Sequence, residues 1–150
     1  MTTSSATGNT KPEAPPSPTR VLLAEDDFEL RELLASVLRA DGYEVTEACD
    51  GNELWALLVQ EPGAGVERAP FSLVVSDLRM PGLSAFDVLS SAQRRLTEIP
   101  VILITAFGDE STHLRALRLG AKRVLDKPFD CDELRDAVQA ALCERAHPAS

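Results

Sequence analysis

The segment SLVVSDLRMPG, residues 72–82, joins a short apolar run to an acidic residue and then to a proline–glycine turn. A run of this length, rich in valine and leucine and bounded by a turn signal, is typical of a β-strand. The strand is predicted at residues 72–76, so Asp77 follows its carboxyl end directly.

Four further runs of this kind lie on either side of the first. They predict strands at residues 21–25, 43–47, 101–105 and 123–126. Longer segments of helical period separate the runs, and this alternation indicates βα units around a parallel sheet. The predicted fold class is therefore α/β.

Apolar residues at helical spacing identify the first and last helices. The predicted buried stripes are Leu30, Leu33, Leu34, Val37 and Leu38 in the first helix, and Leu134, Ala137, Val138, Ala141 and Leu142 in the last. Recurrence at i, i+3, i+4 and i+7 is typical of a helix with one buried face.

Capping residues mark several helix boundaries. Three pairs place a capping side chain before a helix and an acid three residues later: Asp50 with Glu53, Ser84 with Asp87, and Asp130 with Glu133. Gly42 and Gly120 are expected just beyond helix ends, where a left-handed backbone is common.

The chain of 150 residues is long enough for one domain and short for two, so a separate DNA-binding half is not expected within it. Residues 1–19, rich in Thr, Ser and Pro, predict a disordered tail. The domain is predicted at residues 20–145, followed by a short tail at 146–150. Residues 61–70, with two prolines and two glycines, predict a long exposed loop.

Charge and hydropathy limit the classes of partner. The formal net charge is −9, and an acidic domain repels the phosphate backbone of nucleic acids. The sequence has neither an apolar run near the roughly 18 residues of a membrane span nor the apolar segment of a secretory signal. These features predict a cytoplasmic protein without membrane or nucleic-acid partners. Cys49, Cys131 and Cys143 form no CxxC pair, and their odd number favours reduced thiols.

Polar residues stand at the ends of four of the five predicted strands. They are Glu25, Asp26 and Asp27 at the first strand, Asp77 at the third, Thr105 at the fourth and Lys127 at the fifth. In an open α/β sheet, ligands bind beyond the carboxyl ends of the strands. These acids, the hydroxyl and the ammonium are therefore expected to meet at one edge of the sheet.

Such a cluster has a definite chemistry. Carboxylates a few ångströms apart raise one another's pKa unless a cation neutralises them, and an oxygen-only ligand set suits Mg²⁺ or a similarly hard ion. An ionised Asp77 can attack a phosphorus atom while the metal and Lys127 stabilise the phosphoryl oxygens, and Thr105 can donate a hydrogen bond to one of them. Taken singly, Asp26 and Asp27 are helix caps and the others ordinary strand or loop residues, but their joint placement favours a functional site.

Four motifs carry a resemblance to a known family: VLLAEDD (21–27), VVSDLRMPG (74–82), VILITA (101–106) and LDKPF (125–129). In this order and at these intervals they resemble the receiver domain of two-component response regulators, over residues 21–143. The resemblance implies a flavodoxin-like, doubly wound sheet of five parallel strands in the order 2-1-3-4-5, with helices on both faces. It also implies a phosphorylation-dependent switch that is not a turnover enzyme.

The resemblance gives each site residue a role. Asp77 is the implied phosphoacceptor, which takes a phosphoryl group from a phosphohistidine of a sensor histidine kinase or a phosphotransfer protein. Thr105 matches the family's switch hydroxyl, Lys127 its phosphate-pairing lysine, and Lys127–Pro128 a bond that is usually cis. The implied Mg²⁺ site consists of the acidic pair Glu25 and Asp26, Asp77, and the backbone carbonyl of Arg79.

The sequence also departs from the family pattern. Val124 stands where receivers usually have an aromatic ring that swings inward on activation, and Ala85 replaces the usual glycine after the MPG turn. Lys122 and Arg123 stand where the dimerising, winged-helix class of regulators often has paired acids, which weakens the case for that dimer.

Two other functions compete with the receiver interpretation. Haloacid-dehalogenase-type phosphatases also use an aspartyl phosphate with Mg²⁺, but they have a second acid where this chain has Arg79. A flavodoxin-like carrier needs a phosphate-cradling loop after the first strand, where three acids stand here. For a receiver, two outputs remain open, namely direct binding of a target protein or transfer of the phosphoryl group onward. The large side chains of Arg79 and Phe107 are expected to shield the acyl phosphate from water.

Overall fold

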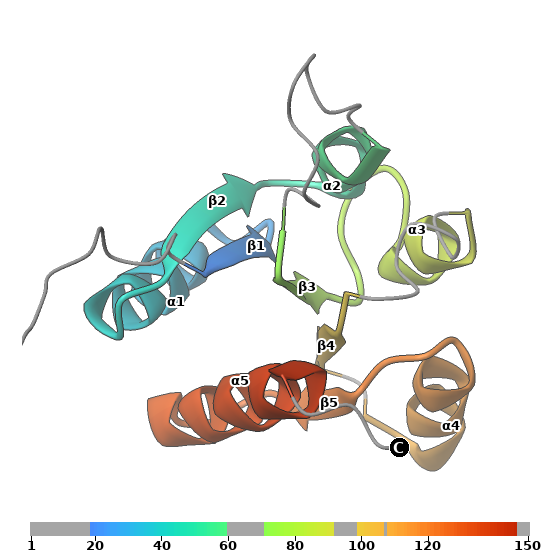
Figure 1. The fold of residues 1–150 in the computed structure, drawn as a ribbon. Helices are drawn as coiled ribbons and strands as arrows, with labels where there is room; N and C mark the ends of the chain where they lie inside the picture. The colour runs from blue at the N-terminus through green and yellow to red at the C-terminus, as the bar shows by residue number, and fades with distance from the viewer. Residues whose placement is uncertain (1–18, 60–70, 92–98, 107, 147–150) are drawn as a thin grey trace, which may run out of the picture.

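The computed structural model describes residues 19–59, 71–91, 99–106 and 108–146. Strands and helices alternate along them (Figure 1): β1 (Arg20–Ala24), α1 (Phe28–Ala40), β2 (Glu44–Ala48), α2 (Gly51–Val59), β3 (Leu73–Asp77), α3 (Ala85–Ser91), β4 (Val101–Thr105), α4 (Glu110–Arg118), β5 (Arg123–Asp126) and α5 (Cys131–Ala146). Residues 1–18 and 147–150, the predicted loop at 61–70 and Phe107 lie outside the described residues. None of the described helices combines the length and hydropathy that a membrane span requires.

The five strands form one parallel sheet in the order β2-β1-β3-β4-β5, which confirms the predicted order. β4 and β5 have the predicted bounds, β1 lies one residue earlier, and β2 and β3 lie one residue later. Asp77 is therefore the last residue of β3, because pairing with β4 continues through the Asp77–Ile104 register pair and the Leu78 N–H bond to the Ile104 carbonyl at 2.7 Å.

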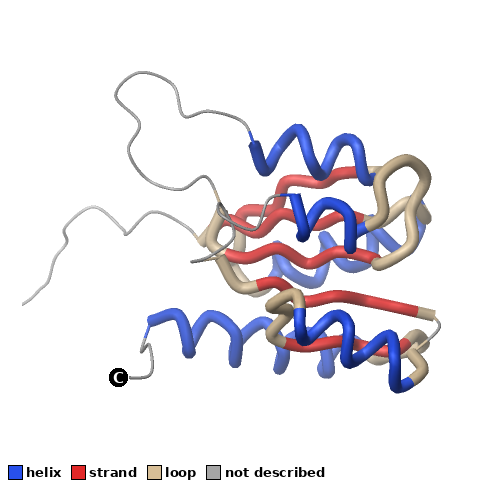
Figure 2. The backbone as a smooth tube through the Cα atoms, turned by 90° about the vertical axis from the view of Figure 1, so that its right-hand side faces the viewer, coloured by secondary structure: helices blue, strands red, loops and turns tan. Residues whose placement is uncertain are grey.

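Helices cover both faces of the sheet, as Figures 1 and 2 show, and each face has its own core. Successive side chains of a strand point to opposite faces. Along β1, Leu22 and Ala24 accordingly pack with α2, α3 and α4, whereas Val21 and Leu23 pack with α1 and α5. A sheet buried on both sides needs strands that are apolar throughout, which explains the fully buried runs of β3 and β4.

The predicted buried stripe is correct for α5 and partly wrong for α1. Leu134, Ala137, Val138 and Ala141 are buried and Leu142 packs against them. The corresponding residues of α1 are buried or packed on the core except Leu33, whose side chain is 52% exposed.

Leu33 is exposed because the buried face of α1 is rotated about the helix axis relative to the predicted stripe. Each residue turns a helix by about 100°, and the core-facing side of α1 is centred between Leu34 and Leu38. Leu33 lies at the edge of that face, and Ala35 is buried at the opposite edge.

The predicted caps are present. Ser84 with Asp87 and Asp130 with Glu133 bond reciprocally through side chain and backbone N–H. The third pair differs in one bond: the Glu53 N–H donates to Asp50, but the Glu53 carboxylate accepts from the N–H of Cys49 instead of that of Asp50. Gly42 and Gly120 follow α1 and α4 with φ of 96° and 100°, the left-handed region that favours glycine. The three cysteines are unpaired, as predicted.

Candidate functional site

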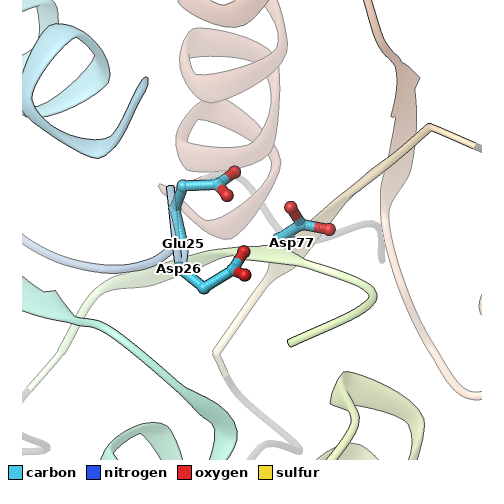
Figure 3. A group of neighbouring side chains, drawn as sticks. All are labelled: Glu25, Asp26 and Asp77. Carbon is cyan, nitrogen blue, oxygen red and sulfur yellow. The ribbon is translucent and has the colours of Figure 1, made fainter. Parts of the chain in front are cut away.

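Three carboxylates meet at the carboxyl ends of β1 and β3. The two strands are neighbours in register, with Ala24 opposite Ser76, so Glu25 and Asp26 emerge beside Asp77. One carboxylate oxygen from each of these acids lies within 4.8 Å of the other two. Figure 3 shows Glu25 and Asp26 extending toward the side on which Asp77 lies. The chain passes from β1 to β2 on one side and reaches β3 on the other, and such a switch in strand order is where α/β sheets bind ligands.

The three acids differ in exposure. Glu25 is fully buried and Asp77 is 5% exposed, whereas Asp26 is exposed. The group therefore forms a buried floor with one carboxylate at the solvent side. A ligand can approach from the side of Asp26.

Lys127 is the cation that faces this group. Its Nζ lies 2.6 Å from Asp77 Oδ2 and 3.3 Å from Glu25 Oε1. Burial lowers the Lys127 pKa, but the hydrogen bond to Asp77 and the charges of Asp77 and Glu25 outweigh burial, so the pKa lies above its usual value. The ammonium is therefore retained at neutral pH. The Lys127–Pro128 bond is cis, as the resemblance implied.

The pKa of Glu25 is raised, mainly by burial. Burial, followed by the charge of Asp77 and a hydrogen bond with it, raises the Glu25 pKa to about 7, although the Asp27 N–H and Lys127 act in the opposite direction. Oε2 accepts the Asp27 N–H at 3.1 Å. Buried Oε1 has no hydrogen-bond partner among the described residues, although the Lys127 ammonium lies within ion-pair distance of it.

These features fit a hard divalent cation. The donors are all oxygen, buried Glu25 Oε1 lacks a hydrogen bond within the described part of the chain, and the ammonium of Lys127 pairs with Glu25 and Asp77 of the three carboxylates. A cation bound here would offset their repulsion and favour the ionised form of Glu25. Of the four predicted metal ligands, the three carboxylates thus form a group that suits Mg²⁺, and the Arg79 carbonyl stays a prediction.

The remaining predicted residues lie around the group. Thr105 is the last residue of β4 and follows Ile104, the register partner of Asp77. It is 1% exposed, and its carbonyl accepts the backbone N–H of Lys127 at 2.8 Å. Arg79 is exposed in the loop after β3, and its backbone N–H donates to Asp77 Oδ1 at 3.1 Å. Asp27 is outside the carboxylate group and caps α1, with its side chain accepting the Leu30 N–H at 3.1 Å.

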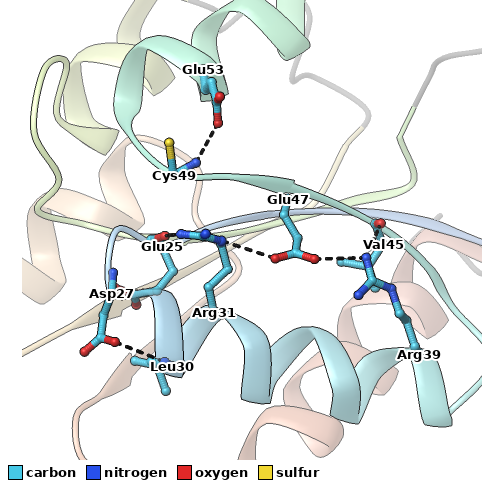
Figure 4. Close-up of polar contacts among 9 residues, drawn as sticks. All are labelled: Glu25, Asp27, Leu30, Arg31, Arg39, Val45, Glu47, Cys49 and Glu53. Atoms are coloured by element: carbon cyan, nitrogen blue, oxygen red, sulfur yellow. Dashed lines mark hydrogen bonds and ion pairs between the residues drawn. The ribbon is translucent and has the colours of Figure 1, made fainter.

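Arg31 is a neighbour of the site that the sequence analysis missed. It donates from NH1 to the Glu25 carbonyl at 2.8 Å and from Nε to Glu47 at 3.2 Å (Figure 4). An arginine in the first turn of a helix usually extends into water, and nothing in its spacing from Glu25 or Glu47 indicates these bonds. Only the packing of α1 beside β1 and β2 brings them together.

Comparison with known proteins agrees with this geometry. The family model described as response regulator receiver domain matches residues 21–139. The chain is 38% identical over 125 residues to the C4-dicarboxylate transport transcriptional regulatory protein DctD of Pseudomonas aeruginosa, covering 83% of this chain and 25% of that protein. It is 33% identical over 131 residues to the transcriptional regulatory protein CpxR homolog of Haemophilus influenzae, covering 87% and 53%. The chain therefore spans about a quarter to a half of the length of these relatives.

Solved structures show the same fold. A CheY-like receiver domain from Methanospirillum hungatei superposes with a TM-score of 0.76 at 22% identity, covering 89% of this chain and all of that one. Chemotaxis protein CheY4 of Vibrio cholerae superposes with a TM-score of 0.73 at 25% identity, covering 84% and 100%.

Proposed function

Because the chain belongs to the receiver-domain family of two-component response regulators, we propose that it is a switch controlled by phosphorylation of Asp77. The phosphoryl donor is a phosphohistidine of a sensor histidine kinase or of a phosphotransfer protein. The observation that carries the proposal is the environment of Asp77: a nearly buried carboxylate at a strand end, 2.6 Å from Lys127 and grouped with two further acids.

Mg²⁺ is the proposed cofactor. Glu25, Asp26, Asp77 and the backbone carbonyl of Arg79 would hold it, with Asp26 and Asp77 as direct ligands. When bound, the ion neutralises the acidic group and offsets charge on the phosphoryl oxygens.

The transfer needs a small number of groups from this chain. A carboxylate oxygen of Asp77 forms a bond to phosphorus as the phosphorus–nitrogen bond of the donor breaks, and the electron pair leaves with the imidazole nitrogen. The ammonium of Lys127, already held against Asp77, pairs with a phosphoryl oxygen, and the Thr105 hydroxyl donates to another. The donor histidine belongs to the partner, so the chain accepts a phosphoryl group and is not a turnover enzyme.

The downstream step has two forms in this proposal. The phosphorylated protein either binds a target protein or passes the phosphoryl group to a second histidine. We place the reaction in the cytoplasm, with neither nucleic acid nor membrane as a direct partner of this domain, because the whole chain has a net charge of −9 and no apolar run near the length of a membrane span. A phosphatase is disfavoured because Arg79, and not an acid, stands two residues after Asp77.

The test is labelling with acetyl phosphate and Mg²⁺, followed by intact-protein mass and by peptide mapping. We expect stoichiometric, base-labile label on the wild type and none on Asp77→Asn, because the amide keeps the shape of the side chain but is a far poorer nucleophile. Asp136→Asn, which changes an exposed acid on α5, is the matched control and should label normally. Label that persists on folded Asp77→Asn would exclude Asp77 as the acceptor, and continuous turnover of phosphomonoesters would favour the phosphatase.

A further inference from the structure

Arg31 connects α1 to the loop that carries two of the acids. Its guanidinium donates from NH1 to the Glu25 carbonyl at 2.8 Å and from Nε to Glu47 Oε1 on β2 at 3.2 Å. The side chain is 14% exposed. Figure 4 shows it reaching from the helix back to the end of β1, on the side where β2 lies.

The bond to the Glu25 carbonyl bears on Asp26. That carbonyl belongs to the peptide unit before Asp26, and the Asp27 N–H belongs to the peptide unit after it. Arg31 holds the first unit, and Glu25 Oε2 holds the second at 3.1 Å. Because peptide units are planar, fixing the units on both sides of a residue fixes its φ and ψ and thus the direction of its Cβ. An exposed carboxylate such as Asp26 otherwise has little around it to set that direction.

Arg31 is itself held in place. Glu47 Oε1 accepts from Arg31, and neither of the Arg31 bonds involves Arg39, which donates from NH2 to the other Glu47 oxygen at 3.1 Å and to the Val45 carbonyl at 3.0 Å. The Arg31 guanidinium lies 5.5 Å from the centre of the Phe28 ring. The planar guanidinium can make both of its bonds at once, which a lysine ammonium in the same position cannot do with the same geometry.

We infer that Arg31 is a positioning residue for the cation site: its bond to the Glu25 carbonyl fixes the backbone on which Asp26 is presented to Mg²⁺. This inference rests on the proposed function. Groups that orient metal ligands without touching the metal commonly change metal affinity by roughly 10-fold or more when they are removed.

The direction in which Mg²⁺ affinity changes when Arg31 is removed distinguishes a positioning role from an effect of its charge alone. Arg31 carries a positive charge next to a site for a cation, so its charge opposes Mg²⁺ binding. If charge were its main influence, removing it would tighten Mg²⁺ binding slightly. If positioning dominates, removing it weakens binding.

The experiment is a Mg²⁺ titration of the unphosphorylated protein, followed by amide chemical shifts and by calorimetry. For Arg31→Met, which keeps an apolar stem against Phe28, we expect the dissociation constant to rise roughly 10-fold. Arg39→Met is the matched control, since it removes the same charge and a bond to the same Glu47 but has no bond to the loop of Asp26. It should leave the dissociation constant within about two-fold of wild type, since a half-exposed charge is well screened.

Labelling by acetyl phosphate gives a second readout. For Arg31→Met the Mg²⁺ concentration at half-maximal rate should rise as the dissociation constant does, while the rate at saturating Mg²⁺ stays within about two-fold. A merely structural role would lower the melting temperature and leave the half-saturating Mg²⁺ concentration unchanged.

Each result either supports or overturns the positioning role of Arg31. Unchanged or tighter Mg²⁺ binding by Arg31→Met, or equal weakening by Arg39→Met, overturns the positioning role. If Arg31→Met does not fold, Arg31→Lys replaces it, with weakening expected and wild-type affinity as the contrary result. Wild-type protein that neither binds Mg²⁺ nor accepts label would instead refute the proposed function itself, so the two failures are distinguishable.

Discussion

Asp26 and Asp27 are adjacent acids with different environments. Asp26 is exposed and belongs to the group of three carboxylates, whereas Asp27 lies outside it and caps α1. In the sequence both are acids at the same strand end, and either could cap the helix. The structure thus makes Asp26 a candidate metal ligand and the next residue, Asp27, a helix cap.

Asp26→Ala is predicted to abolish saturable Mg²⁺ binding and to slow labelling by acetyl phosphate sharply, because it removes a direct ligand from an oxygen-only site. Mg²⁺ titration by amide shifts measures the first effect and initial labelling rates the second. Asp27→Asn removes the same charge one residue later and keeps a good helix cap, so it should bind Mg²⁺ like wild type. An Asp26→Ala titration curve that matched wild type would show that the metal is held elsewhere.

At the scale of elements, β4 and β5 carry Thr105 and Lys127 to the site, and α4 contacts β5. Thr105 ends β4, and Lys127 follows β5 directly. Val124 on β5 is half-buried, pairs in register with Leu103 and packs against the core under α2, α3 and α4. His113 on α4 lies 2.9 Å from Asp126 at the end of β5. The polar contact between α4 and β5 thus lies at the end of β5, whereas Val124 in the strand makes apolar contacts with the core.

Phosphorylation is predicted to move residues 105–110 and to leave Val124 and Leu125 nearly unchanged. Coupling needs an element with two arrangements that the phosphoryl group biases differently. Valine has no ring to swing and is stiff at χ1, so β5 offers no such element at position 124. The measurement is the change in amide chemical shifts on adding beryllofluoride and Mg²⁺, with Mg²⁺ alone as control. Shifts at Val124 and Leu125 as large as those at residues 105–110 would contradict this account of the coupling.

At the scale of the whole molecule, the site is also a source of instability. It groups three carboxylates, two of them buried, with one lysine, and these residues come from the segment after β1, the end of β3 and the residue after β5. Like charges at this separation disfavour the compact state unless a cation is present. A ligand that binds the folded state alone stabilises it by mass action.

Mg²⁺ is therefore predicted to raise the free energy of unfolding, by about 2.7 kcal/mol when its concentration is 100 times the dissociation constant. Urea denaturation with and without Mg²⁺, at matched ionic strength with NaCl, measures this difference. Asp26→Ala should lose most of the Mg²⁺-dependent stabilisation. It should also be at least as stable as wild type without metal, since one of the repelling charges is gone. Equal stabilisation of wild type and Asp26→Ala would contradict the assigned site.

Much of this protein follows from the sequence alone. Strand length, apolar runs and helical period determine the five βα units, because burial on both faces requires strands that are apolar throughout. The acids, hydroxyl and ammonium stand at strand ends, and parallel strands bring those ends to one edge. For these reasons the sequence alone predicts Glu25, Asp26, Asp77, Thr105 and Lys127 as residues of the site.

Tertiary structure decided what depends on contacts between distant segments. Leu33 fits the helical period of α1, but the buried face of the helix is centred between Leu34 and Leu38, which leaves Leu33 at its edge. The Glu25 oxygen without a hydrogen bond and the raised Glu25 pKa depend on burial, which no local pattern reports. The bonds of Arg31 to the Glu25 carbonyl and to Glu47 exist only because α1 packs beside β1 and β2. Sequence periodicity predicts the approximate buried face of a helix or strand, whereas the distances between side chains, their burial and the alignment of their hydrogen bonds arise only when separate elements pack together.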